Sequence, residues 1–291
     1  MKDIYIHIGT HKTGTTTIQH ALLETAQTNP KGDLSVWVHP SPQFAHVDKY
    51  DKTLVKRFQI ELKRWIKRNK SATNLVISGE DLSGSPYNGY QNSNVACSML
   101  RDVTSQYNVK IIIYLRRQDS FIESMYTQMI HEGNTLEFGN FLKIFDSKDA
   151  LNYLHMLNDL ESYFGEQNLI VRSYHEASKR GLFVDFGEII NCNSIRYSRK
   201  GDKNPSYSRH AVELAKICNA YLDDYRKKKL RAALQYAMPK QRNESFSFLT
   251  DDERVRILAK YAEPNLEIAD RYFSGDLERL FPTTNIRSSD P

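Results

Sequence analysis

The chain has 291 residues, of which 40% are hydrophobic and 26% are charged, an ordinary composition for a globular protein with a substantial core. No apolar run approaches the ~20 residues that span a bilayer, and no secretory leader precedes the first strand pattern. We therefore expect a cytoplasmic protein without a transmembrane segment. The net charge of +5 is too small to indicate nucleic-acid binding, although it fits a protein whose ligands are anions.

The three cysteines also favour a reducing compartment. They are odd in number and widely spaced, at Cys97, Cys192 and Cys218. This spacing matches neither a zinc pattern nor a disulfide framework. We therefore expect free thiols and no bound metal.

The first half of the chain alternates strand patterns with helix patterns. Isoleucines at every second position of 4–8 predict a strand that ends at Gly9, and apolar spacing predicts a helix at 15–27. Short apolar runs predict further strands at 74–78 and 109–115. The run VKIIIYL at 109–115 is nearly continuously apolar, as in a parallel strand that is covered on both faces. Helical spacing is found at 54–70, at 95–105 and from about residue 120.

The second half adds a fourth strand pattern, at 168–174, and is otherwise helical. Its helix patterns lie at 150–163, 183–191, 210–225, 230–236, 251–261 and 265–273. Strands that alternate with helices predict an α/β fold: a P-loop-type parallel sheet flanked by helices, with a helical C-terminal elaboration. Since there is no repeat or linker, we expect one domain over residues 1–282 and a loose tail over 283–291.

The segment between the first strand and the first helix, IHIGTHKTGTTTIQ, has the features of an anion-binding loop. A glycine loop that leads into a helix offers backbone N–H groups and a helix N-terminus to an anion. Lys12 adds a positive charge, and hydroxyl donors come from Thr13, Thr15, Thr16 and Thr17. In the nucleotide-triphosphate loop, however, the lysine directly follows the second glycine, whereas Lys12 precedes Gly14 by two residues. A tight turn with capping threonines is the alternative interpretation.

This stretch resembles the 5′-phosphosulfate loop of sulfotransferases, which use 3′-phosphoadenosine 5′-phosphosulfate (PAPS). Bacterial members often carry His-Lys-Thr-Gly-Thr-Thr, which is the sequence of residues 11–16. The resemblance implies that Lys12 is catalytic, because a positive charge stabilises the oxygen that leaves sulfur. It also implies PAPS as co-substrate, 3′,5′-adenosine diphosphate as product and no required metal. The implied cofactor contacts are Lys12, Thr13, Gly14, Thr15, Thr16 and Thr17.

The same resemblance predicts a 3′-phosphate site further along the chain. In the family, this phosphate is bound by an arginine at the end of a later strand and a serine eight residues on. Arg116 and Ser124 stand at these positions, with Arg117 as a neighbouring alternative. An arginine forks onto phosphate oxygens, and a serine near a helix start adds a hydroxyl donor. The family's basic loop over this phosphate corresponds to Arg199 and Lys200, for which a solvated loop is the alternative.

Sulfuryl transfer to a hydroxyl needs a general base, which the resemblance places after the second core strand. Glu80 follows that strand and is the predicted base, because a carboxylate at the C-terminal end of a parallel strand points to where such sheets bind ligands. Asp81, His7 and His11 are the alternative candidates, and His7 is equally compatible with a core histidine. Two tyrosines of the following loop are candidates for stacking on sugar rings: Tyr87 and Tyr90.

We therefore predict a PAPS-dependent sulfotransferase that sulfates a hydroxyl of a glycan or glycolipid by in-line displacement. The acceptor class follows from the resemblance to bacterial carbohydrate sulfotransferases, and the sequence leaves the oligomeric state open. A P-loop kinase and an inactive nucleotide-binding regulator are the alternatives. The basic residues of 54–70 and the run RKKKLR at 226–231 are typical of solvated helix faces, with an acidic glycan as the alternative interpretation for each.

Overall fold

The computed structural model describes residues 3–28, 34–38, 52–192, 195, 206–240 and 246–282. The chain divides into two compact units. Unit 1 comprises Met1–Arg116, Lys148–Ser198 and Glu263–Phe281, and unit 2 comprises Arg117–Ser147, Arg199–Ala262 and Pro282–Pro291. The predicted tail at 283–291 and the predicted loop with Arg199 and Lys200 lie outside the described residues. That the chain forms one domain stays a prediction.

Unit 1 contains a five-stranded sheet in the order β2-β3-β1-β4-β5, in which all neighbouring strands are parallel. The strands are β1 (Asp3–His7), β2 (Leu34–Val38), β3 (Asn74–Ser78), β4 (Asn108–Leu115) and β5 (Leu169–Ser173). The predicted parallel α/β fold is confirmed, and four of these strands were predicted. The pattern missed β2, an edge strand that is half-buried along its whole length and so lacks a buried apolar run.

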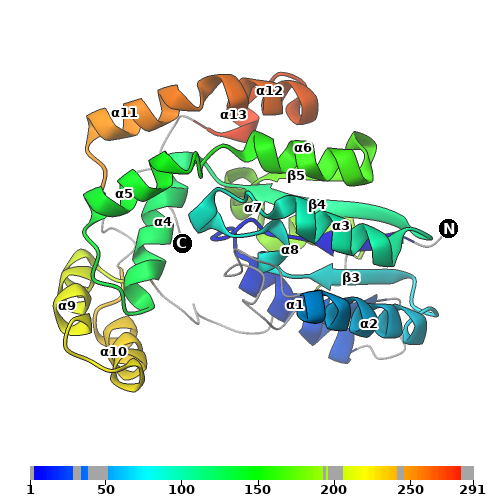
Figure 1. The fold of residues 1–291 in the computed structure, drawn as a ribbon, viewed down its shortest axis with the longest axis horizontal. Coiled ribbons are helices and arrows are strands. Elements are labelled where there is room, and N and C mark those ends of the chain that lie inside the picture. The colour runs from blue at the N-terminus through cyan, green and yellow to red at the C-terminus, as the bar shows by residue number, and fades with distance from the viewer. Residues whose placement is uncertain are drawn as a thin grey trace. The chain divides into compact units, whose positions relative to one another are not determined.

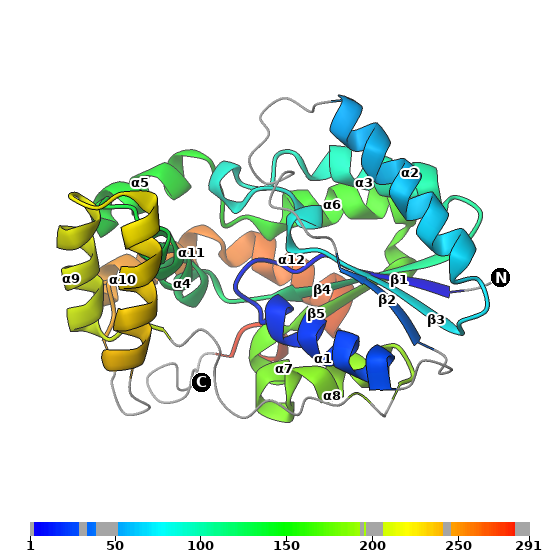
Figure 2. The same ribbon diagram turned by 90° about the horizontal axis from the view of Figure 1, so that it is seen from below.

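Helices cover both faces of this sheet, as Figure 2 shows. One face packs on α1 (Thr15–Thr28), α7 (Tyr174–Arg180) and α8 (Leu182–Ile189), with Tyr5, Val76, Ile112 and Tyr114 in the contact. The other face is covered by α2 (Lys52–Arg68), α3 (Ser93–Thr104) and α6 (Tyr153–Phe164). Because side chains alternate along a strand, the residues between those of the first face serve the second, and Ile4, Ile6 and Ile111 are fully buried there.

Two later helices complete unit 1. On α12 (Ala262–Phe273), Arg271 and Tyr272 both contact Glu161 of α6, which fixes α12 on that helix. The short α13 (Leu277–Leu280) contacts α7 and β5. The loops that follow β1, β3, β4 and β5 therefore lie at one end of the sheet, where the C-terminal ends of these parallel strands meet.

Unit 2 is helical and consists of α4 (Gln118–His131), α5 (Phe138–Ser147), α9 (Arg209–Asn219), α10 (Asp224–Ala237) and α11 (Asp251–Lys260). Its core includes Tyr126, whose ring contacts those of Phe138, Phe141 and Phe248. The side-chain amide of Asn219 donates to the carbonyls of Ile130 and Asn134, both at 3.0 Å, and so joins the end of α9 to the end of α4.

The helices α9 and α10 of unit 2 form a hairpin and lie side by side in Figures 1 and 2. The predicted single helix over 210–225 is wrong, because α9 ends at Asn219 and α10 starts at Asp224. Asp223 is the N-cap of α10, and its side chain accepts a hydrogen bond from the Arg226 amide at 2.8 Å. Among the described helices of either unit, none is long and apolar enough to cross a membrane.

Candidate functional site

The loop after β1 is held against β4 by its backbone. The Tyr114 amide donates to Gly9 O at 2.7 Å, and the Thr10 amide donates to Tyr114 O at 3.1 Å. The hydroxyls of Thr13 and Thr15 both donate to Thr10 O, at 2.6 and 3.4 Å. Since a hydroxyl has one hydrogen to donate, these two threonines shape the loop in this conformation.

Gly14 ends the loop in a left-handed conformation that favours glycine. Its φ is +76°, and a Cβ at this position would lie 2.4 Å from Leu182 Cδ1. The first bond of α1 runs from the Ile18 amide to Gly14 O, at 3.1 Å. The amides of the first helical turn, at Thr15, Thr16 and Thr17, therefore have no intrahelical acceptor, which gives this end of α1 its positive potential.

Lys12 connects this loop to the two neighbouring strand ends. Its backbone is left-handed, with φ +59°. Its amide donates to Glu80 Oε1 at 3.2 Å, and its carbonyl accepts from Arg116 Nη1 at 3.0 Å. The predicted lysine, base and phosphate-binding arginine come from the ends of β1, β3 and β4, and the structure brings all three together.

Glu80 reaches the loop because of where β3 ends. The Gly79 amide donates to His7 O at 3.0 Å, which keeps the chain beside β1, and Glu80 then begins the 3₁₀-helix η1 (Glu80–Ser83). The Glu80 side chain is half-buried. The neighbouring carboxylate of Asp81 instead lies 3.7 Å from Nε2 of His11, so the two alternative bases Asp81 and His11 are next to each other.

His7 is a core histidine, as the sequence allowed. Its side chain is fully buried, its Nδ1 lies 2.9 Å from Ser78 Oγ, and its ring meets the edge of Phe186. The amide of Gln19 donates to the same Ser78 oxygen at 3.2 Å. Burial lowers the pKa of His7 to about 3, so the ring is neutral at pH 7. A residue enclosed in this way does not reach an acceptor, which removes His7 from the candidate bases.

Tyr90 packs against the loop instead of facing solvent. It is 2% exposed, and its hydroxyl lies close to Thr10 and to the backbone of His11. Burial raises the pKa of Tyr90 well above its usual value, so the phenol stays protonated. The sequence interpretation that Tyr90 stacks on a sugar ring is therefore wrong, whereas Tyr87 is half-buried in the same segment.

Arg116 is positioned by two aromatic residues that the sequence analysis did not assign to the site. Its guanidinium carbon lies 5.1 Å from the centre of the Tyr174 ring. Its carbonyl accepts from the Tyr153 hydroxyl at 2.8 Å. The sequence feature that could have identified Tyr174 is its position directly after β5. This strand lies beside β4, and both strands end on the same side of the sheet.

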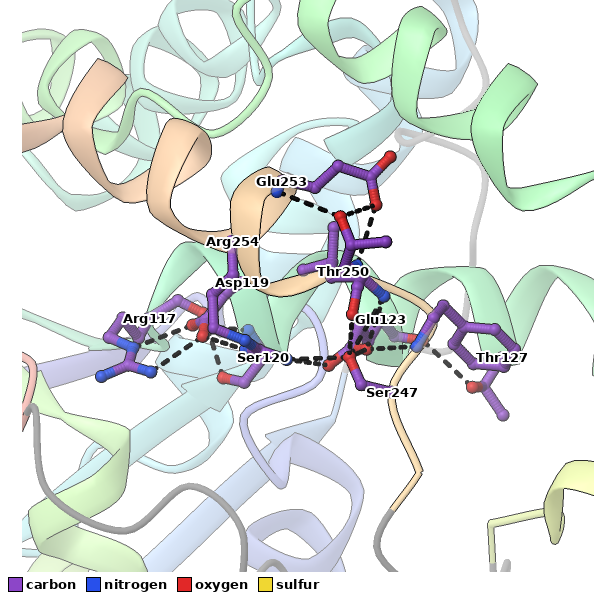
Figure 3. A network of polar contacts seen from close by, with 11 residues as sticks. Arg117, Asp119, Ser120, Glu123, Thr127, Ser247, Thr250, Glu253 and Arg254 are labelled. Carbon is purple, nitrogen blue, oxygen red and sulfur yellow. Dashed lines mark hydrogen bonds and ion pairs between the residues drawn. The ribbon is translucent and has the colours of Figure 1, made fainter.

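Arg117, the alternative phosphate ligand, has a different environment in unit 2. Its Nε and Nη2 donate to the two oxygens of Asp119 at 2.9 and 2.8 Å, and its Nη1 donates to Pro282 O at 2.7 Å. Arg254 of α11 also pairs with Asp119, as Figure 3 shows. Burial by itself would raise the pKa of Asp119, but the hydrogen bonds and charges of the two arginines outweigh it and lower that pKa. The guanidinium of Arg117 is thus bound within unit 2, and its role as the alternative phosphate ligand stays a prediction.

The same polar network continues along α4 (Figure 3). Glu123 Oε1 accepts from the hydroxyl of Ser247 at 2.5 Å and from the amide of Phe248 at 2.6 Å. These bonds tie α4 to the turn before α11, where Thr250 and Glu253 form a capping box. Ser124 is the next residue of α4 and is half-buried, and its role in phosphate binding stays a prediction.

Metal ions are usually bound by clustered His, Cys, Asp and Glu side chains. Within the described residues, no group of three or more His, Cys, Asp and Glu side chains is arranged to hold an ion. The loop instead carries Lys12, whose peptide groups contact the Glu80 carboxylate and the Arg116 guanidinium. This combination suits an anionic ligand together with a group that loses a proton.

No protein-family model matches the chain. An uncharacterised protein of Archaeoglobus fulgidus is 26% identical over 171 residues, which are 56% of this chain and 46% of that protein. The match thus spans about half the length of this curated relative. Solved structures with a similar fold include a sulfotransferase from Alicyclobacillus acidocaldarius, with 13% identity, a TM-score of 0.45 and coverage of 81% of this chain and 96% of that one.

A mouse sulfotransferase complexed with PAP is also similar, with 15% identity, a TM-score of 0.41 and coverage of 94% of this chain and 86% of that one. A retinol dehydratase in complex with androsterone and the inactive cofactor PAP has 12% identity, a TM-score of 0.38 and coverage of 93% and 81%. These likenesses are remote. Residue roles in this chain are therefore argued from its own side chains.

Proposed function

We propose that this chain is a PAPS-dependent sulfotransferase. The observation that carries the proposal is the position of Lys12, whose peptide groups bind Glu80 on one side and Arg116 on the other. In this proposal Glu80 is the base, Lys12 supplies the cation for the leaving group and Arg116 supplies the cation for a phosphate, next to the N-terminal end of α1. This set fits a doubly anionic donor, because the amides of Thr15, Thr16 and Thr17 add further donors for one phosphate.

The proposed roles follow from what each group can do. The donor supplies the sulfuryl group. Glu80 takes the proton of the acceptor hydroxyl as the new oxygen–sulfur bond forms, and Lys12 stabilises the negative charge on the bridging oxygen as its bond to sulfur breaks. Arg116 holds the 3′-phosphate, which carries the same charge before and during the reaction. The product is 3′,5′-adenosine diphosphate, and the proton stays on Glu80 until solvent removes it.

The acceptor in this proposal is a hydroxyl of a glycan or glycolipid. It rests on the resemblance of three segments to bacterial carbohydrate sulfotransferases: the His11–Thr16 loop, NPSYS with the following VELAKICN within 204–219, and YAEPNLEIADRYF at 261–273. A screen of glycan and glycolipid acceptors with radiolabelled PAPS tests this step separately from the donor. Transfer to simple phenols or steroids but to no sugar would contradict the acceptor class and leave the reaction type standing.

The donor is tested by thermal unfolding. We expect 3′,5′-adenosine diphosphate to raise the melting temperature without added magnesium, and to do so more than ATP or GTP, because a ligand that binds only the folded chain stabilises it. Stabilisation by ATP only when magnesium is present would favour the kinase instead. Binding of 3′,5′-adenosine diphosphate without transfer to any acceptor would favour the inactive regulator.

The substitution Lys12→Ala separates leaving-group stabilisation from simple binding. We expect it to lower kcat by roughly 10²–10³, the effect of removing one transition-state donor, with a small change in KM for the donor. The left-handed backbone at this position is equally strained for alanine and lysine, so we expect the substitution to remove the charge without changing the loop conformation. A variant that changes only KM would show that Lys12 binds the donor without acting on the leaving group.

A further inference from the structure

The tip of the α9–α10 hairpin exposes large apolar side chains. Ile217 is 64% exposed near the end of α9, Tyr221 is 83% exposed in the turn, and Tyr225 is 67% exposed in the first turn of α10. Further from the tip, Leu214 and Tyr236 are 40% and 91% exposed. These five make up half of the exposed large hydrophobic residues in the described part of the chain, so apolar exposure is concentrated on this hairpin.

Basic side chains adjoin these apolar residues. Lys228 and Lys229 are exposed on α10, and Lys229 Nζ lies 4.6 Å from the centre of the Tyr225 ring. Neither lysine has a carboxylate partner among the residues that the structure describes. The acidic groups at the tip are Asp224 and Asp223, and Asp223 caps α10 and lies 3.7 Å from Nε of Arg226.

Charge is unevenly distributed along this hairpin. Residues 206–240 contain eight Lys and Arg residues but three Asp and Glu residues. Part of this charge is used inside unit 2: Lys216 pairs with Glu137 and Glu213, and the stem of Lys227 packs at Gly133. The positive charge that remains at the tip faces solvent beside Ile217, Tyr221 and Tyr225.

We propose that the hairpin tip, defined as Ile217, Tyr221, Tyr225, Lys228 and Lys229, binds the surface of a lipid bilayer that contains anionic lipids. Tyrosine rings sit at the level of lipid headgroups, an aliphatic side chain enters the acyl boundary, and lysines are attracted to anionic headgroups. All three kinds of residue are present within about one helical turn on either side of the hairpin turn.

The composition favours a membrane surface over the other possible occupants. Lysine is depleted in the core of protein–protein interfaces, which disfavours a second copy or a partner protein at a tip with two unpaired lysines. An acidic glycan would use the lysines and the tyrosines but would leave Ile217 and Leu214 in water. A bilayer surface accounts for the apolar, aromatic and basic residues together.

The helix α2 provides a comparison within the same chain. It is also basic, with Lys56, Arg57, Lys63, Arg64 and Lys67 exposed, but among those of its side chains that the structure describes the one large exposed hydrophobic residue is Ile60, at 41%. Many exposed charges with little apolar exposure are typical of a solvated helix face. We therefore assign membrane binding to the hairpin tip and none to α2, which makes α2 the matched control.

The test is co-sedimentation of the full chain with vesicles of phosphatidylcholine mixed with phosphatidylglycerol, and with vesicles of phosphatidylcholine alone. We expect binding to the mixed vesicles that weakens as salt is added. The variant Lys228→Gln/Lys229→Gln should bind about 30-fold more weakly, since each basic residue near an anionic surface contributes roughly fivefold. The variant Tyr221→Ser/Tyr225→Ser should also lose binding, and both should keep their melting temperatures because these side chains are exposed.

The control is Lys63→Gln/Lys67→Gln on α2, which changes the net charge by the same amount. We expect it to bind like the unchanged chain. An equal loss in the control and in the hairpin variant would show general charge attraction and overturn the proposal, as would equal binding to vesicles without anionic lipid. A dimer that is seen by light scattering and lost in Tyr221→Ser/Tyr225→Ser would assign the tip to a second copy instead.

Discussion

Arg116 and Arg117 are neighbours in the chain, but they belong to different units and have different surroundings. The guanidinium of Arg116 contacts the carbonyl of Lys12 and the face of the Tyr174 ring. Those of Arg117 are both oxygens of Asp119 and the carbonyl of Pro282. One guanidinium is thus placed by a carbonyl and a ring, and the other is bound in the fork-to-fork geometry that gives the strongest ion pairs.

The carboxylates of the two units differ in the same way. Glu80 is half-buried and accepts one amide, from Lys12, which leaves further lone pairs for a ligand or a proton. Asp119 is fully buried and accepts from Arg117, Ser120 and Arg254. A carboxylate whose acceptor sites are filled contributes to stability, whereas one that is partly open to solvent is suited to chemistry. Burial and the number of filled acceptor sites, not residue type, distinguish the proposed base from the structural carboxylate.

The largest expected effect is on turnover, from Glu80→Gln. Glutamine has the same shape and its oxygen still accepts the Lys12 amide, so the loop is preserved while the basicity is removed. We expect kcat to fall by roughly 10²–10⁴, the usual contribution of a general base, and the melting temperature to stay within the experimental error. Steady-state kinetics with saturating donor measure the change.

The matched control for Glu80 is Asp81→Asn, which alters the neighbouring carboxylate beside His11. We expect near-normal turnover. If Asp81→Asn abolishes turnover while Glu80→Gln does not, the base is Asp81 or the neighbouring His11. Glu80 would then not be the catalytic carboxylate that is compared with Asp119.

The next effect is on stability, from Asp119→Ala. Removing this carboxylate leaves the buried guanidinium of Arg117 without its main partner, and breaking a buried pair typically costs about 3–5 kcal/mol. Denaturant unfolding followed by a probe in unit 2 measures the loss. The control Glu137→Gln removes the exposed partner of Lys216, and an exposed pair contributes under about 1 kcal/mol. Equal costs for the two variants would show that burial does not distinguish these ion pairs.

A smaller effect separates the two arginines directly. Arg116→Ala should raise KM for the donor roughly 10- to 100-fold, because one charge-assisted phosphate contact is lost in ground and transition states alike. Arg116→Lys should recover part of this, since it keeps the charge and loses the fork. Arg117→Ala should leave the KM of the folded fraction unchanged and lower the free energy of unfolding. The reverse pattern would assign phosphate binding to Arg117.

The sequence predicted those elements that are determined by residues close together in the chain. The isoleucines of β1, the run of β4 and the Lys12 loop are contiguous, so period and spacing predicted the parallel sheet and its first loop. The edge strand β2 has no buried run to detect, and the start of α10 depends on Asp223 as its N-cap within a pattern that looks continuously helical. These two elements needed the structure.

Two features of the site depend on contacts between distant segments, and these do not appear in any short pattern. Tyr174 lies 58 positions after Arg116 along the chain and meets it because β4 and β5 pair. The ion pair of Arg117 with Asp119 is close in sequence, but Arg254 joins it from α11. Spacing favoured Arg116 and left Arg117 as the alternative, whereas the different surroundings of the two guanidinium groups became visible only in the structure.

The smallest expected effect uses pH to compare the two units. Burial lowers the pKa of His7 to about 3 in the folded chain, against about 6.5 when unfolded, so the unfolded chain binds one more proton between these values. The stability that neutral His7 contributes is present above pH 6.5 and is lost as pH falls below it, by about 2 kcal/mol at pH 5. The pKa of Asp119 is lowered from about 3.8, so its contribution is lost only at more acidic pH.

Between pH 6.5 and pH 4, acid should therefore destabilise unit 1 through His7 while the Asp119 network of unit 2 stays intact. Hydrogen exchange followed by mass spectrometry measures this: protection should fall in peptides of β1 and β4 before it falls in those of α4 and α11. In His7→Gln, which has no titrating ring, the stability of unit 1 should depend less on pH over this range, whatever its value at pH 7. An unchanged pH slope in His7→Gln would show that His7 does not carry the acid sensitivity, and simultaneous loss in both units would show that they unfold as one.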